Sequence, residues 1–259
     1  MVLKKRAQSA NQVKVKVWRR ARRAQLVARR LAVGAATRRR WSLTIVDFLR
    51  AGFPSLAAGT TIGVYAPFRG EPDVRAAVDH WRLAGATTAL PVVVSPGAPL
   101  EFRAFGPGVR MRKGVFGLPI PQGTPVVTPQ VLLIPAVGFD AAGYRLGHGG
   151  GYFDRTLAAL TPPPLKIGIA FELSRIASIR PQAHDIAMDF IVTEAGIHAV
   201  TAAGLELVSD RRRIPAITRA LRTRRGGRVL SPAPADVVAD EVRGCASPPC
   251  SAHEFGLDD

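Results

Sequence analysis

Residues 131–155 read VLLIPAVGFDAAGYRLGHGGGYFDR, and this stretch decides the expected fold class. The apolar run Val131–Pro135 is typical of a short buried strand. A glycine-rich loop follows at Gly143–Gly151, and a helix is predicted over about residues 152–160, where a run of prolines ends it. A strand, a glycine-rich loop and a helix in this order are typical of α/β proteins.

The same alternation recurs on both sides of this stretch. Strands are predicted at residues 61–65, 88–94, 166–171 and 190–193, with a helix at 72–83 between the first two. We therefore expect an α/β fold with a mostly parallel sheet and helices on both faces, in which ligands bind at the carboxyl ends of the strands. Residues 106–130 are rich in Gly and Pro and are expected to form a long irregular connection.

The net charge of +17 is concentrated at the N-terminus. Residues 1–50 hold 15 Lys and Arg against the single acidic residue Asp47. Two amphipathic helices are predicted there, at about 16–36 and 38–50. Basic helices of this kind can be a solvated face, a nucleic-acid-binding surface or part of an anionic ligand site, and all three readings stay open from charge alone.

Composition divides the chain into three parts. We expect a flexible basic N-terminus at 1–15, a single α/β domain at 16–208 and a disordered tail at 209–259, where periodicity is lost. No apolar run is long enough to cross a membrane, and no secretory signal is recognisable. Cys245 and Cys250 have neither metal-site nor disulfide-framework spacing, which favours a reducing, cytoplasmic location.

The glycine-rich loop is a candidate phosphate-binding site. Glycines allow backbone N–H groups to approach a polyphosphate closely, and the N-terminus of the following helix favours negative charge. The loop is not a Walker A motif, and it fails the dinucleotide pattern because Tyr152 occupies the last glycine position. A turn with no ligand remains an alternative from these residues alone.

The longer stretch IPAVGFDAAGYRLGHGGGYFDR resembles the signature of the 5-formyltetrahydrofolate cyclo-ligase family at nearly every defining position. It departs at His148, where the family commonly has Tyr or Arg, and at Phe153, where Tyr is common. The resemblance spans about residues 19–198. It implies an α/β fold related to the ribose-phosphate isomerase and CoA-transferase group.

The resemblance also implies an ATP site in two parts. The N-terminal stretch RRARRAQLVARR resembles a family helix whose Lys and Arg contact ATP, and it places Arg19, in place of the Lys, and Arg23 at those positions. These two residues share a helix face. Arg145 and Asp154 are the expected catalytic residues. In the loop, the residues expected to bind ATP are Arg145, Gly147, His148, Gly149, Gly150, Gly151, Tyr152 and Phe153.

Two further segments resemble the family's substrate and metal sites. YAPFRGEPD places Glu71 where the family has the acid that contacts the folate, and Tyr152 is expected to join it. HDIAMDFIVTE places Asp189 as a second carboxylate for Mg²⁺ beside Asp154. Glu71 could instead be a helix-start acid, and either Asp could be a helix cap or a paired loop acid.

The resemblance implies a monomeric enzyme that uses ATP and Mg²⁺ to convert 5-formyltetrahydrofolate to 5,10-methenyltetrahydrofolate, with release of ADP and phosphate. The formyl oxygen would attack the γ-phosphoryl group, and ring closure would then expel phosphate. Two alternatives stay open: a related protein that binds a nucleotide but acts on another substrate, and a nucleic-acid-binding protein that uses the basic helix. Membrane binding is not expected, and nucleic acid is a less favoured partner.

Overall fold

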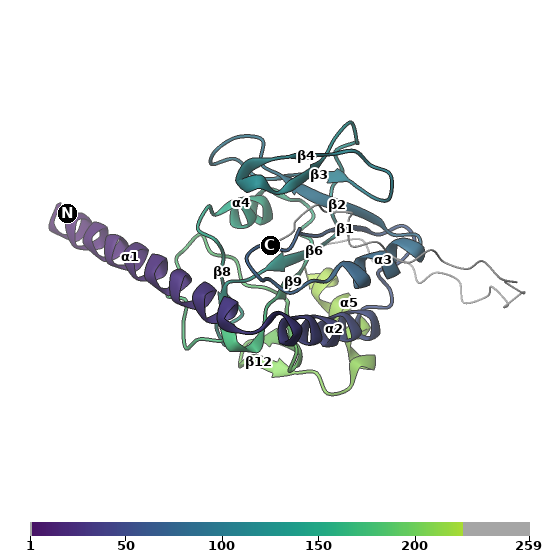
Figure 1. Cartoon of the computed structure of the whole chain (residues 1–259). Coiled ribbons are helices and arrows are strands. Elements are labelled where there is room, and N and C mark those ends of the chain that lie inside the picture. The colour runs from purple at the N-terminus through teal and green to yellow at the C-terminus, as the bar shows by residue number, and fades with distance from the viewer. Residues whose placement is uncertain (1, 225–259) are drawn as a thin grey trace, which may run out of the picture. The chain divides into compact units, whose positions relative to one another are not determined.

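The computed structural model describes residues 2–224, with side chains from residue 12 onward except that of Phe116 (Figure 1). A central sheet of eight strands has the order β12-β11-β10-β9-β6-β1-β2-β3. The five strands from β10 to β2 pair in parallel, and the outer strands β3, β11 and β12 pair in antiparallel fashion. The expected mostly parallel sheet is thereby confirmed. The strands are β1 Thr61–Gly63, β2 Thr87–Val92, β3 Glu101–Ala104, β6 Val131–Pro135, β9 Leu165–Ile169, β10 Phe190–Thr193, β11 Gly196–Thr201 and β12 Gly204–Leu207.

Two small hairpin-like pairs stand outside this sheet. β4 (Met111–Lys113) pairs with β5 (Pro119–Pro121), so part of the region expected to be irregular forms a strand pair. β7 (Gly138–Phe139) pairs with β8 (Arg145–Leu146) just before the glycine-rich loop. These short strands and the edge strands β11 and β12 were not predicted. Three single 3₁₀ turns complete the description: η1 Val115–Gly117, η2 Glu172–Ser174 and η3 Arg211–Arg213.

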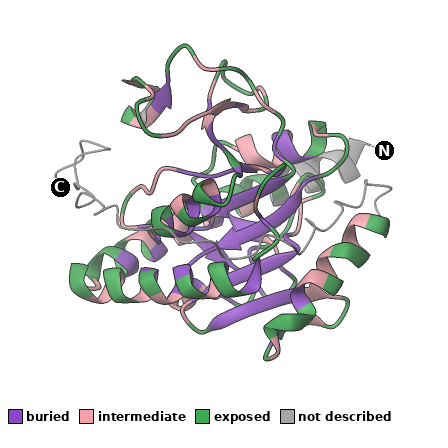
Figure 2. Cartoon of the chain, turned by 90° about the vertical axis from the view of Figure 1, so that its right-hand side faces the viewer, coloured by how far each residue is buried: buried purple, intermediate pink, exposed green. Residues whose placement is uncertain are grey.

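Helices cover both faces of the sheet, as expected. Phe190 of β10 packs edge-on against Phe53, the residue that ends α2 (Ala35–Gly52), with ring centroids 5.3 Å apart. The next residue, Ile191, lies in an apolar cluster with Leu157 of α4 (Tyr152–Ala159). Because successive strand residues point to opposite faces, α2 and α4 lie on opposite sides. Figure 2 shows the strands between them as buried.

The helical ends of the described chain differ from the expected boundaries. α1 runs from Val2 to Ala32, so the described part of the segment 1–15, which we expected to be flexible, is drawn as helix. This part holds many good helix formers and neither Gly nor Pro. The folded part also extends past 208, since α5 (Ile214–Arg224) follows η3. The rest of the expected tail, 225–259, lies outside the described residues. Among the described helices, none is long and apolar enough to cross a membrane.

The order of the strands creates a candidate ligand-binding position. β1 leads through α3 (Arg75–Leu83) to β2 on one side, whereas β6 leads through α4 to β9 on the other side. The direction of winding therefore reverses between the neighbouring strands β1 and β6. In open α/β sheets, ligands bind at such a switch point, outside the carboxyl ends of the strands.

Candidate active site

Helix α1 lies across the loops that follow three parallel strands. Its arginines donate to backbone carbonyls in each loop: Arg30 Nε to Arg69 after β1 at 3.0 Å, Arg23 Nε to Gly147 after β6 at 2.7 Å, and Arg19 Nε to Ile179 after β9 at 3.1 Å. The spacing of these arginines places them on one helix face. The helix thus fixes the loops around the switch point.

The glycine-rich loop depends on glycine for its backbone. Gly151, which precedes α4, has a φ of 65°, and Gly149 has a φ of 107°. Residues other than glycine rarely adopt such positive φ angles. A Cβ at Gly149 would also lie 3.3 Å from Cζ of Arg23, so the guanidinium packs directly on the loop. The first N–H groups of α4 have no partners within the helix, which makes this end suited to an anion.

Arg23 is the cation best placed to meet such an anion. Burial and the nearby charge of Arg19 lower the pKa of Arg23, while Asp185 opposes them. Within the described part of the chain, the Gly147 carbonyl is the one acceptor of a hydrogen bond from its side chain. A partly desolvated guanidinium crowded by a second one is stabilised by an added negative charge. This environment suits a phosphate.

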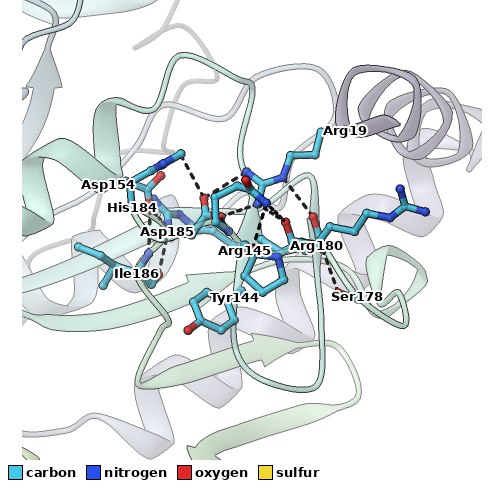
Figure 3. A network of polar contacts seen from close by, with 12 residues as sticks. Arg19, Tyr144, Arg145, Asp154, Ser178, Arg180, His184, Asp185 and Ile186 are labelled. Atoms are coloured by element: carbon cyan, nitrogen blue, oxygen red, sulfur yellow. Dashed lines mark hydrogen bonds and ion pairs between the residues drawn. The ribbon is translucent and has the colours of Figure 1, made fainter. Parts of the chain in front are cut away.

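Arg19, an expected ATP contact, is bonded to the loop that follows β9. All three nitrogens of its guanidinium donate to the loop after β9: Nε to Ile179, Nη2 to the Arg180 carbonyl at 2.9 Å, and Nη1 and Nη2 to the Asp185 carboxylate (Figure 3). The Arg19 and Asp185 side chains are only 10% and 7% exposed. Because the protein takes up the hydrogen-bonding capacity of Arg19, we propose that this residue anchors α1 rather than contacting ATP.

Arg145 and Asp154, the two expected catalytic residues, contact each other. Arg145 Nη1 lies 3.1 Å from Oδ1 of Asp154, and the backbone N–H of Ile186 donates to the same oxygen at 3.2 Å (Figure 3). Arg145 is 3% exposed and Asp154 is 17% exposed. Among the described residues, Oδ2 of Asp154 has no hydrogen-bond partner. The pair therefore holds one carboxylate oxygen in place and leaves the other one accessible.

The Glu71 carboxylate contacts the glycine-rich loop directly. Its Oε1 lies 2.8 Å from Nε2 of His148, and its Oε2 accepts from the Phe68 N–H at 3.0 Å. Because a carboxylate only accepts hydrogen bonds, the imidazole donates. The loop after β1 and the loop after β6 therefore meet through this pair, at the predicted switch point.

Comparison with known proteins identifies the family. The model described as the 5-formyltetrahydrofolate cyclo-ligase family matches residues 15–194, which is more than half of the chain. The chain belongs to this cyclo-ligase family. β11, β12 and α5 lie beyond the matched region.

Individual members of the cyclo-ligase family agree with this match. A 5-formyltetrahydrofolate cyclo-ligase of Mycolicibacterium smegmatis is 32% identical over 145 residues, covering 52% of this chain and 74% of the relative. The Escherichia coli K12 protein of the same name is 28% identical over 155 residues, covering 56% and 84%.

Solved structures of family members share the fold. The 5,10-methenyltetrahydrofolate synthetase of Aquifex aeolicus matches with a TM-score of 0.62 and 25% identity, covering 74% of this chain and 98% of that one. The Mycoplasma pneumoniae synthetase matches with a TM-score of 0.56 and 26% identity, covering 68% and 98%. The relation to the ribose-phosphate isomerase and CoA-transferase group stays a prediction.

Asp189 lies at the amino ends of the parallel strands, away from the glycine-rich loop. The family pattern led us to expect this residue to hold Mg²⁺. It immediately precedes β10, and its Oδ2 accepts from the Lys166 backbone N–H at 2.8 Å. Its Oδ1 lies 3.2 Å from Nζ of Lys166, near the start of β9. Both oxygens thus contact Lys166. From this geometry we propose a structural role for Asp189 at the amino ends of β9 and β10 in place of the expected Mg²⁺ contact.

The aromatic residues at the start of α4 are placed differently from one another. Arg155 lies over the Tyr152 ring at 5.1 Å, and the phenol stays partly exposed beside the loop. Phe153, where the cyclo-ligase family commonly has Tyr, packs against the apolar cluster under α4 and lies 5.9 Å from the Arg145 guanidinium. The missing hydroxyl of Phe153 is therefore at a position that faces the protein interior.

Arg30 is a site residue that we did not predict. It is 1% exposed, and its Nη2 has no hydrogen-bond partner in the described structure. Burial lowers the pKa of Arg30, while the neighbouring Glu71 charge opposes the shift. Its position seven residues after Arg23 on the same helix face was a signal that could have found it. Arg30 supplies positive charge close to the Glu71 carboxylate.

Proposed function

We propose that the chain catalyses the ATP-dependent ring closure of 5-formyltetrahydrofolate to 5,10-methenyltetrahydrofolate, with release of ADP and phosphate. The observation that carries this proposal is the 2.8 Å contact between Glu71 and His148, which joins the expected folate-binding acid to the expected phosphate-binding loop. Membership of the cyclo-ligase family supports the same reaction.

The chemistry explains why a phosphate donor and a folate must meet. A formamide oxygen is a poor leaving group, so ring closure needs it to be activated. Its attack on the γ-phosphorus of ATP breaks the bond to ADP and makes the formyl oxygen part of a phosphate ester. The nitrogen at position ten then attacks the formyl carbon, and the carbon–oxygen bond breaks as phosphate leaves together with that nitrogen's proton.

The residues of the site suit this sequence of steps. Phosphoryl transfer mainly requires positioning and neutralisation of charge, which the N–H groups of the glycine-rich loop, the start of α4 and Arg23 can provide. Glu71 can accept hydrogen bonds from the N–H groups of the pterin ring. Arg145 is too buried to reach a substrate easily, and in this proposal it positions Asp154.

Asp154 is the proposed ligand of Mg²⁺. Among the described residues, no cluster of three or more His, Cys, Asp or Glu could hold a metal, so this part of the chain offers no complete cage. That fits Mg²⁺, which usually binds one or two carboxylates and completes its coordination with water and substrate phosphates. The open Oδ2 of Asp154 suits such a ligand, and the bound ion would neutralise phosphate charge.

The test is the absorbance of the methenyl product when the purified chain meets 5-formyltetrahydrofolate, ATP and Mg²⁺. We expect a rise only when all three are present, and ADP release should match product in a one-to-one ratio. A folded chain that binds ATP by calorimetry yet gives no rise would refute the proposed reaction and favour a family member with another substrate.

A further inference from the structure

Glu71 is covered by a part of the protein itself. Its side chain is only 2% exposed, although its carboxylate is the group proposed to receive the folate. One oxygen accepts from Phe68, and the other contacts His148. A buried carboxylate is costly unless it is hydrogen-bonded, so these contacts stabilise it. Because the Glu71 side chain is so little exposed, a ligand N–H can reach Oε1 only if a covering group moves, and the partner of Oε1 is the partly exposed His148.

The loop that carries Glu71 is held rigidly. Arg30 donates to the Arg69 carbonyl at 3.0 Å, and the hydroxyl of the buried Tyr65 donates to the Pro72 carbonyl at 2.7 Å. Both contacts tie the turn that contains Glu71 to its surroundings. Glu71 is therefore the fixed member of the pair.

His148 has the features of the movable member. Its side chain is 38% exposed, and Gly147 and Gly149 flank it. Besides Glu71, its ring contacts the edge of Phe68, with centroids 5.7 Å apart. A Cβ at Gly147 would meet no atom within 4 Å, so there is open space beside the loop at this point. The Gly147 carbonyl accepts from Arg23 at 2.7 Å, and a phosphate that engages Arg23 would compete for this contact. Once the contact is released, the backbone freedom of glycine allows this segment to change conformation at low cost.

We propose that His148 is a latch that couples ATP binding to folate binding, an inference that rests on the proposed function. The imidazole N–H occupies the position on Glu71 that a pterin N–H would take. When the glycine-rich loop rearranges around the phosphates of ATP, His148 leaves Glu71 and uncovers it. His148 belongs to the same loop as the phosphate-binding glycines, so the two events are mechanically linked.

This latch has a thermodynamic signature. Each ligand should strengthen the binding of the other, and by linkage both effects must be equal. We expect ATP to tighten folate binding by about five- to tenfold, within the usual range of coupling between two sites. Removing the imidazole should tighten folate binding in the absence of nucleotide and abolish most of the coupling. A residue that merely orients Glu71 would give the opposite result, weaker folate binding.

The experiment is calorimetric titration of the full chain with 5-formyltetrahydrofolate, with and without a saturating non-hydrolysable ATP analogue and Mg²⁺. His148→Ala should bring the ratio of the two dissociation constants close to one. His148→Phe should do the same while it keeps the contact with Phe68, which guards against a folding defect in the alanine variant. His148→Gln can still donate to Glu71 and should retain part of the coupling.

The matched control is His80→Ala, the same change at an exposed position on α3, and it should behave like the unmodified chain. Unchanged coupling in both His148→Ala and His148→Phe would overturn the latch, as would weaker folate binding in both. If the unmodified chain binds ATP and folate and turns over, these results bear on the latch alone. If it binds neither ligand, the proposed function fails, and the latch fails with it.

Discussion

Beyond the carboxyl ends of the parallel strands, one oxygen of Asp154 accepts two hydrogen bonds and the other oxygen has no partner in the described structure. At the amino ends of the strands, by contrast, both oxygens of Asp189 contact Lys166. Both residues fall at positions where the cyclo-ligase pattern suggests a metal carboxylate. Their surroundings assign them different work. A carboxylate with an open oxygen can bind a ligand, and a carboxylate with both oxygens bonded stabilises the fold.

The same distinction separates the arginines of α1. Arg19 resembles Asp189, because all of its guanidinium nitrogens are bonded to Asp185 or to two backbone carbonyls. Arg23 resembles Asp154, since only its Nε is hydrogen-bonded to the described chain and its other nitrogens can bind a ligand. Contacts in the folded protein therefore divide residues of the same type into two groups, and we propose that the residues with unbonded polar atoms bind the ligands.

The strongest test of the comparison is Asp154→Asn. Loss of the negative charge should lower kcat/KM by on the order of 100-fold or more and raise the Mg²⁺ concentration needed for half-maximal rate. The fold should persist, because the amide oxygen can still accept from Arg145 and Ile186. Steady-state kinetics with Mg²⁺ titration and thermal unfolding measure both effects. The control is Asp79→Asn on the exposed side of α3, and equal rates in the two variants would contradict the role of Asp154.

Asp189→Asn should show the reverse pattern. It removes the charge partner of Lys166 in a pair whose side chains are 4% and 11% exposed, and loss of one member of a buried pair costs about 3 kcal/mol. We expect the free energy of unfolding in urea to fall by that order, while turnover per folded molecule and its Mg²⁺ dependence stay as in the unmodified chain. A raised Mg²⁺ requirement with unchanged stability would restore Asp189 to the metal site.

The parts of the fold that could be predicted depend on local pattern. Val131–Pro135 is apolar throughout because the strand is buried on both faces, and the glycine-rich loop with its following helix has a local signature. These features predict the central strand, the loop and α4. The repeated alternation of strands and helices predicts the mostly parallel sheet. The missed strands β11 and β12 are short antiparallel strands joined by tight turns, so no long loop separates them from β10 in the sequence.

The parts that could not be predicted depend on long-range contacts. Arg19 and Asp185 are 166 positions apart, and no spacing in the sequence shows that they form a pair. Glu71 and His148 are separated by 77 positions, and the family pattern suggested their ligands but not their contact with each other. A motif therefore located the site, whereas the division of its charged residues between structure and chemistry required the folded chain.

The smallest expected effect is the change in stability with pH that comes from the buried pair of Arg19 and Asp185. Burial by itself raises the pKa of Asp185, but the hydrogen bonds from Arg19 and the Gln182 N–H outweigh it, and the net shift is downward. Because its pKa is lowered, Asp185 binds a proton less readily in the folded protein than in the unfolded chain, where an Asp has a pKa of about 3.9. The stabilisation is thus present above that value and is lost as pH falls through the lower pKa of the folded state.

Asp185→Asn should therefore be less stable than the unmodified chain at neutral pH, and the gap in urea midpoint should narrow as pH falls below about 4. Other carboxylates titrate in both proteins, so the difference between them isolates Asp185. Asp210→Asn provides the control: its pair with Arg212 is exposed, and such pairs contribute little to stability. If the difference in urea midpoint stayed constant down to pH 3, the charge of Asp185 would not stabilise the fold. Arg19 would then be free to bind a phosphate, contrary to the anchoring role proposed for it.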